Sequence, residues 1–194
     1  MAVRSRLIHD DGGQRTFVLV FDTGDEAMEG LSEFARDQGL SAAQLTGIGA
    51  FSEVTLGYFD WQTKEYTRIP LDEQVEVVSL LGDVALEGDE PVVHAHVVVA
   101  HSDGRASGGH LLGGRVRPTL EVVLTESPAH LRKRHDASSG LALIALDDEP
   151  QGETSLPHVP DELANLTGEQ AQRLVEDEAE TPRGSTEAGA GLEP

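Results

Sequence analysis

Strand-like segments follow one another through most of the chain, with short breaks of Gly, Pro and Asp between them. Runs of this kind are typical of β-strands separated by turns. Beyond residue 42 we predict strands at 43–50, 54–60, 65–69, 74–84, 92–101, 105–112, 119–125 and 141–146. Consecutive strands without helices between them pair mainly in antiparallel fashion, because a parallel pair needs a long crossover. This succession restricts the chain to folds built on a largely antiparallel sheet.

One helix is predicted near the start of the chain, directly after a buried strand at Thr16–Phe21. Thr23 and Glu26 have the spacing of a capping box, and Gly39 suits the C-terminal end of the helix. Apolar residues at helical spacing form one face, namely Met28, Leu31, Phe34 and Ala35. We therefore expect an α+β fold in which this principal helix packs on a curved, mainly antiparallel sheet.

Acidic charge is concentrated at the C-terminal end. The chain has 35 acidic and 14 basic side chains, a net charge of −21, and residues 147–194 alone hold 13 acidic and 2 basic ones. That stretch is rich in Pro, Gly, Thr and Glu, so it cannot bury enough apolar surface to offset chain entropy. We predict a folded domain over 1–146 and a mostly disordered acidic tail over 147–194. Within the tail, Thr167–Gln170 has capping-box form and favours a short helix, either loosely docked or partner-binding.

The composition also excludes or disfavours several function classes. Without cysteine, the chain has no disulfides, thiol nucleophiles or Cys-ligated metals. The acidic balance disfavours direct binding to DNA, which depends on clustered Lys and Arg. No apolar run reaches the roughly 18 residues of a membrane span, so we predict a cytoplasmic protein with no membrane partner. Abundant acidic residues, with Arg far more common than Lys, resemble proteins of halophilic microbes.

Three histidines are predicted to converge on one face of a β-hairpin. His94 and His96 lie two residues apart in a strand, so their side chains point to the same side. The segment Ser102–Gly104 suits a three-residue hairpin turn, which places His96 directly opposite His110. The Cβ atoms of such a pair lie about 4.5–5.5 Å apart. Three imidazoles with one position left open suit a tetrahedral zinc site, and other first-row divalent metals also accept them.

Other interpretations of this region remain open. Two histidines in one strand are also compatible with solvated surface residues, and a bulge at Gly108–Gly109 would shift the register by one residue. His101 falls at the strand end and faces away, so we assign it to the loop. If the site is catalytic, Glu121 in the following strand and Asp103 in the turn are candidate general bases.

These segments, in this order, resemble the plants and prokaryotes conserved (PPC) domain family, whose plant members are the AT-hook nuclear-localised proteins. The resemblance covers about residues 8–146 and is carried by the opening strand and helix and by Val75–Gly82, His94-x-His96 and Gly108–Leu111. It implies an α/β domain on an antiparallel sheet that assembles as a homotrimer. It also implies a metal, usually zinc, bound by His94, His96 and His110.

Prokaryotic members of that family are commonly labelled DNA-binding, a label that leans on the plant proteins. An AT-hook needs an R-G-R-P core to enter the minor groove, and the nearest string here, at 114–118, is GRVRP. The first functional hypothesis is therefore a trimeric, metal-binding regulatory or scaffold module that binds protein partners or, through them, DNA. The second is a zinc-dependent hydrolase or lyase with an open coordination position, and the third is a structural metal at the subunit interface.

Overall fold

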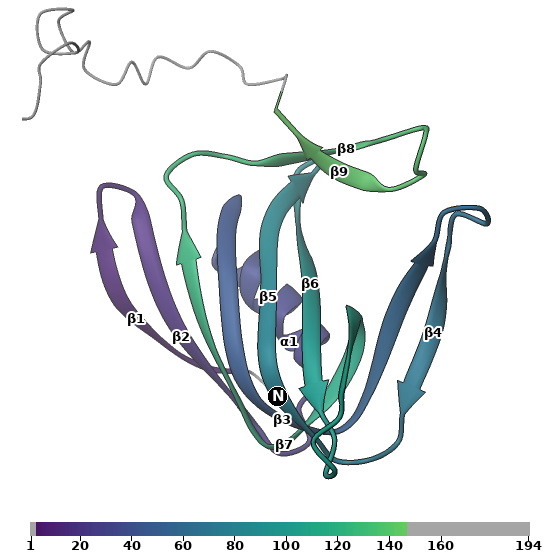
Figure 1. Ribbon diagram of the computed structural model, residues 1–194. Coiled ribbons are helices and arrows are strands. Elements are labelled where there is room, and N and C mark those ends of the chain that lie inside the picture. The colour runs from purple at the N-terminus through teal and green to yellow at the C-terminus, as the bar shows by residue number, and fades with distance from the viewer. Residues whose placement is uncertain (1–2, 147–194) are drawn as a thin grey trace, which may run out of the picture. The chain divides into compact units, whose positions relative to one another are not determined.

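The computed structural model describes residues 3–146 (Figure 1). Within this range the elements are β1 (Arg4–Asp11), β2 (Gln14–Asp22), α1 (Ala27–Asp37), β3 (Ala42–Asp60), β4 (Glu65–Leu71), β5 (Val75–Glu87), β6 (Glu90–Ala100), β7 (Ala106–Glu126), β8 (Arg132–His135) and β9 (Ala142–Ala145). The tail predicted at 147–194, with its short helix, lies outside the described residues, so the domain boundary stays a prediction.

The expected α+β class is wrong, because the described part of the chain is mostly β. Strands make up 67% of it and the single helix 8%, so helix and sheet are not balanced partners. The sheet is also mixed, since β8 runs parallel to β5 through the pairs Leu86↔Arg132 and Glu87↔Lys133. The strand content is high because strands continue through stretches where the sequence predicted breaks. The sheet is mixed because the chain after β7 returns alongside β5.

In two places, two consecutive predicted strands are one long strand in the structure. The segments at 43–50 and 54–60 join in β3, and those at 105–112 and 119–125 join in β7. Their ladder shifts register at Gly49, Phe51 and Thr55 rather than ending there. Such bulges bend a strand without terminating it, so the predicted breaks at 51–53 and 113–118 are points of curvature within β3 and β7.

Helix α1 lies behind β5 and β6 in the view of Figure 1 and buries its apolar face in the core. Leu31, Phe34 and Ala35 are buried as predicted, and the Phe34 ring meets Phe17 of β2 edge-on with centroids 5.2 Å apart. The helix begins later than the capping box at Thr23 suggested. Glu26 is the N-cap instead, and its carboxylate accepts a hydrogen bond from the Glu29 amide.

Strand β6 holds His94 and His96, two of the three histidines of the predicted metal site. It is paired on one edge with β5 and on the other with the first residues of β7, while β3 pairs with both β5 and β7. The strands β3, β5, β6 and β7 therefore form a closed circuit of ladders. Odd-numbered residues of β6 from Val93 to Val99 are buried in the core, so the even-numbered ones face outward.

The described residues contain no helix that is long and apolar enough to cross a membrane.

We expect Gly82→Ala to destabilise the domain, because β5 and β6 approach closely there. A Cβ on Gly82 would lie 2.4 Å from the carbonyl oxygen of His94. The strands would have to separate, which costs about 1–3 kcal/mol of unfolding free energy in a packed region. Urea denaturation measures the loss. Gly113→Ala is the matched control, since its Cβ would meet only the end of the Glu26 side chain, at 3.1 Å; equal losses in both variants would contradict the argument.

Candidate metal centre

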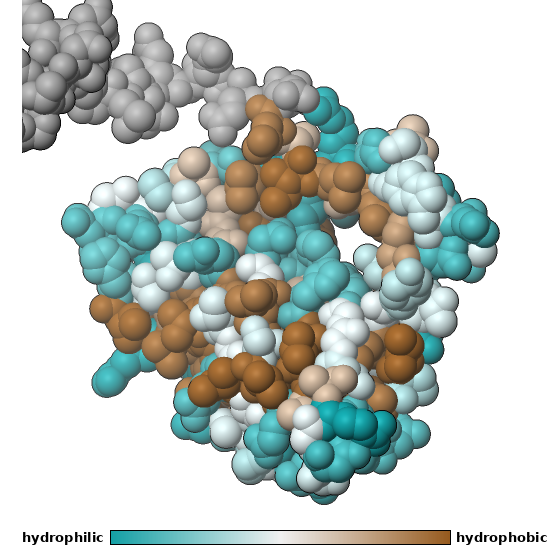
Figure 2. Space-filling model, viewed as in Figure 1, coloured by the Kyte–Doolittle hydropathy of each residue, from teal (hydrophilic) through white to brown (hydrophobic). Residues whose placement is uncertain are grey.

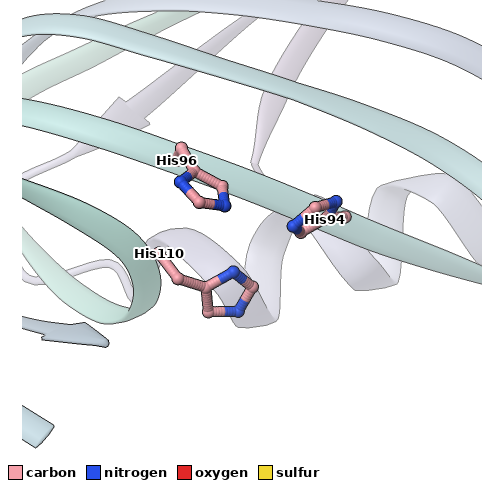
Figure 3. A group of neighbouring side chains, drawn as sticks. All are labelled: His94, His96 and His110. Carbon is pink, nitrogen blue, oxygen red and sulfur yellow. The ribbon is translucent and has the colours of Figure 1, made fainter. Parts of the chain in front are cut away.

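His94, His96 and His110 form one cluster of side chains across β6 and β7 (Figure 3). His96 stands directly opposite His110, and the pairing runs without a shift from Ala106 to His110, so the register predicted from the turn is confirmed. The three ring centroids lie 5.1–5.3 Å apart. One nitrogen from each ring can be chosen so that all three lie within 4.8 Å of one another.

The environment keeps two of these imidazoles neutral. Burial, together with the charges of His94, His96 and Lys133, lowers the pKa of His110 from 6.5 to about 4. Burial and the neighbouring His94 also lower the pKa of His96. The Nδ1 atom of His110 is buried and has no hydrogen-bond partner. A buried ring nitrogen costs free energy unless something occupies it, and a metal ion is one such partner.

Asp83 is a part of the site that the sequence analysis missed. It lies on β5 directly opposite His94, with Asp83 Oδ2 3.3 Å from His94 Nδ1. Burial opposes its ionisation, but the contact with His94 and the charge of Lys133 outweigh burial and lower the pKa of Asp83. Counting back from the tight turn at Gly88–Asp89 would have placed Asp83 opposite His94, so the signal was present.

Lys133 of β8 completes this arrangement. Its Nζ lies 3.2 Å from Asp83 Oδ1, and its side chain is only 4% exposed. The approach depends on the parallel pairing of β8 with β5, and residues 87 and 133 are too far apart in sequence for a turn to predict it. The site thus has a partly buried ion pair beside His94.

An aromatic side chain covers the other side of the trio. The ring of Tyr66, on β4, lies over the ring of His110 with centroids 4.7 Å apart and planes inclined by 30°. Phe59 of β3 contacts Tyr66 edge-on at 5.4 Å. This stack limits the orientations open to the His110 ring, so two of the three histidines are held by neighbours outside the hairpin.

The two candidate bases lie elsewhere. Asp103 bonds Arg105 at the tip of the β6–β7 turn, seven residues from His96, or roughly 20 Å along an extended strand. Glu121 is exposed on β7, paired with Ile48 of β3 and Val20 of β2. Neither belongs to the cluster in which ligand atoms converge. The structure therefore brings together the three histidines and Asp83, and not these two carboxylates.

The donor set fits a divalent metal. Three imidazoles from two paired strands offer three nitrogen ligands, and among residues 3–146 no carboxylate belongs to the cluster in which ligand atoms converge. A carboxylate on the second nitrogen of a ligating histidine is a common arrangement, because it fixes the tautomer and raises the basicity of the ring. Asp83 stands where it can do this for His94.

Known proteins resemble this chain over most of the described residues. A family model of the Plants and Prokaryotes Conserved (PCC) domain matches residues 9–128. The PPC protein of Pyrococcus horikoshii is 32% identical with a TM-score of 0.65, covering 73% of this chain and 100% of that one. A metal-containing protein from Archaeoglobus fulgidus is 29% identical with a TM-score of 0.63, covering 75% and 99%. A "putative DNA-binding protein" from Ralstonia eutropha is 29% identical with a TM-score of 0.63, covering 67% and 90%.

Curated proteins also match. The bifunctional protein GlmU of Synechococcus sp. strain JA-3-3Ab is 36% identical over 118 residues, which is 60% of this chain and 18% of that protein. A second Synechococcus GlmU is 33% identical over 132 residues, or 66% of this chain and 20% of that protein. The chain thus spans about a fifth of the length of these curated relatives.

In metal-free protein we expect stability to fall as the pH is lowered from 6.5 towards 4. The folded pKa of His110 is lowered from 6.5 to about 4, so in this interval the unfolded chain binds a proton that the folded chain does not. His110→Asn removes this contribution, and the variant should lose less stability over the same interval. Urea midpoints measured in chelator at pH 7, 5.5 and 4.5 check this. Parallel curves for the two proteins would contradict it.

Proposed function

The chain belongs to the Plants and Prokaryotes Conserved (PCC) domain family, and we propose that it is a metal-binding regulatory module whose three-histidine centre holds a divalent ion, zinc first among the candidates. The family match confirms the resemblance noted in the sequence. The observation that carries the proposal is the convergence of three ligand nitrogens within 4.8 Å of one another. The buried, unpartnered Nδ1 of His110 supports it, as does the metal-containing relative from Archaeoglobus fulgidus.

In this proposal Asp83 and Lys133 position a ligand rather than bind the metal. Asp83 accepts the Nδ1–H of His94, which leaves the Nε2 lone pair free for coordination. Lys133 keeps Asp83 ionised despite its partial burial. When bound, a divalent ion in such a donor set would supply Lewis acidity and an open coordination position.

A zinc-dependent hydrolase or lyase is the second candidate, favoured by that open position. It needs a general base within hydrogen-bond reach of the bound water. Asp83, the carboxylate that contacts His94, is also engaged by Lys133, and Asp103 and Glu121 lie outside the cluster. For this reason we prefer the binding module over the enzyme.

We propose that any association with DNA runs through protein partners, although structural relatives carry a DNA-binding description. Five described arginines already form ion pairs with carboxylates of the same chain: Arg4–Asp22, Arg15–Glu126, Arg105–Asp103, Arg115–Glu53 and Arg132–Asp89. A phosphate backbone would have to compete with these partners and with the net charge of −21. Cytoplasmic location and a halophilic source stay predictions.

The homotrimer stays a proposal supported by an apolar outer face. Five large apolar side chains on the described strands are exposed on it, Ile48 of β3, Val78 and Leu81 of β5, Val98 of β6 and Val123 of β7. Figure 2 shows exposed apolar patches among polar ones on the side from which Figure 1 is drawn. Such patches are typical of surfaces that other subunits cover. We propose that two further copies of this chain cover it.

The metal proposal predicts stoichiometric metal in untagged protein and its loss in His96→Ala. Asp83→Asn and Lys133→Met should each weaken zinc binding by about 10–100-fold, because they release His94 without removing a ligand. Arg4→Met is the matched control, since it breaks the exposed Arg4–Asp22 ion pair between β1 and β2, and neither strand contributes a histidine to the centre. Elemental analysis and competition with a chromophoric chelator measure both effects. Metal-free wild-type protein that also fails to bind added zinc would overturn the proposal.

The trimer proposal predicts that Ile48→Glu yields monomers. Ile48 is 62% exposed in the single chain, so a charge there costs the folded subunit only its repulsion with the exposed Glu121 opposite, but would be buried in a trimer. Light scattering coupled to size exclusion gives the mass, and circular dichroism checks the fold. Exposed Leu7 on edge strand β1 is the control position for Leu7→Glu. A wild-type protein that is monomeric at micromolar concentration would end the proposal.

A further inference from the structure

A second side-chain cluster lies on the opposite face of the β6–β7 hairpin. His101, directly after β6, stands between two hydrogen-bond partners. Its Nε2 lies 2.8 Å from Ser107 Oγ of β7, and its Nδ1 lies 2.9 Å from Glu73 Oε1 in the loop between β4 and β5. The His101 side chain is only 9% exposed, while that of Glu73 is 55% exposed.

This cluster is separate from the metal centre. Ser107 is three residues from His110 on the same strand, so the two side chains leave opposite faces of β7. Ser107 pairs with Val99, a core-facing residue of β6, whereas His110 pairs with outward-facing His96. The function of one cluster therefore does not depend on the other.

The order of the contacts fixes the roles of the ring nitrogens. A carboxylate on Nδ1 favours the tautomer that carries its proton there. Nε2 is then the acceptor, and the Ser107 hydroxyl donates to it. Serine, histidine and a carboxylate joined in this sequence have the connectivity of an activated serine nucleophile.

Another Ser–His contact in the chain lacks the third member. Ser41 Oγ lies 2.5 Å from His130 Nδ1, and within residues 3–146 no carboxylate bonds the second nitrogen of His130. That pair has no group to fix the tautomer or to stabilise a protonated ring. The Ser41–His130 pair is therefore an internal control for the contribution of Glu73 to the Ser107–His101 pair.

We propose that Ser107, His101 and Glu73 form a nucleophilic site for acyl transfer from small carboxylic esters. Ser107 Oγ bonds to the ester carbonyl carbon as its proton passes to His101 Nε2, and the carbonyl electron pair moves to oxygen. When the tetrahedral centre collapses, the C–O bond to the alcohol breaks and the alcohol takes the proton from His101. Water then attacks the acyl-serine by the same route and releases the carboxylic acid. Glu73 stabilises the imidazolium at each stage.

The backbone beside Ser107 offers a donor for the developing oxyanion. The amide of His101 bonds the carbonyl of Arg105, and the alternation of an antiparallel ladder then directs the Gly108 N–H away from β6. On that edge β3 pairs with β7 only from His110 onward among the described residues. The Gly108 amide directly follows the serine, which is a usual place for such a donor. Ser107 is half-buried, whereas residues 102–106 and Gly108 beside it are exposed, so small esters would approach from this side.

Phosphonylation by a fluorophosphonate tests this site without using the metal centre. Ser107 Oγ would bond to phosphorus, fluoride would leave, and the serine proton would pass through His101 to solvent. In protein kept in chelator we expect one adduct per chain, mapped to Ser107 by mass spectrometry of peptides. Ser107→Ala should abolish it, and Ser41→Ala should leave it unchanged. Failure of this test leaves zinc binding by the three histidines unaffected, and the reverse also holds.

The remaining variants separate a nucleophilic site from a structural contact. His101→Gln should slow labelling of Ser107 at least 100-fold through loss of the base, and Glu73→Gln about tenfold. Urea midpoints are measured beside the rates, so that unfolding is not mistaken for loss of the base. With p-nitrophenyl acetate, wild type should release one equivalent of p-nitrophenolate in a burst that Ser107→Ala lacks. Folded protein with unlabelled Ser107, or His101→Gln labelled as fast as wild type, would overturn the proposal.

Discussion

The pairing of β6 on both of its edges is the constraint on which the rest of the molecule depends. Tight turns at Gly88–Asp89 and Ser102–Gly104 join β6 to its two neighbours, so the register of each ladder is set locally. A slip by one residue on either side would exchange core and surface faces along the whole strand. The same alternation that buries Val93 to Val99 therefore presents His94 and His96 outward. The register of β6 that packs the core is therefore also the register that forms the histidine site.

The sequence could predict contacts between residues that a short turn joins, and it could not predict contacts between residues far apart in the chain. The opposition of His96 and His110 required only a three-residue turn and the two-residue period of a strand, and it is confirmed. The position of Asp83 could be derived in the same way. Lys133 could not, because its approach to Asp83 depends on a parallel pairing across a large sequence separation. The Ser107–His101–Glu73 contacts were missed because Glu73 lies in the loop between β4 and β5, which is not connected to the β6–β7 hairpin by a short turn.

The errors in fold class have a related cause. Strand ends were predicted at 51–53 and 113–118, but long strands can absorb such irregular stretches as bulges when both edges are paired. Glu26, and not the predicted Thr23, caps the helix. The Glu26 carboxylate also accepts a hydrogen bond from the Gly114 amide of β7, which attaches the start of the helix to the sheet. The Thr23 hydroxyl donates to the Pro118 carbonyl instead. In both cases a tertiary contact outweighed a local preference.

The place of Lys133 in the chain makes the centre depend on the last hairpin that the structure describes. Lys133 lies on β8, which is attached to β5 by two residue pairs, and its Nζ lies 3.2 Å from Asp83 Oδ1. The three histidines, by contrast, lie on strands of the closed circuit of ladders. A change confined to the β8–β9 hairpin would therefore alter the charge beside His94 and leave the three ligand positions in place.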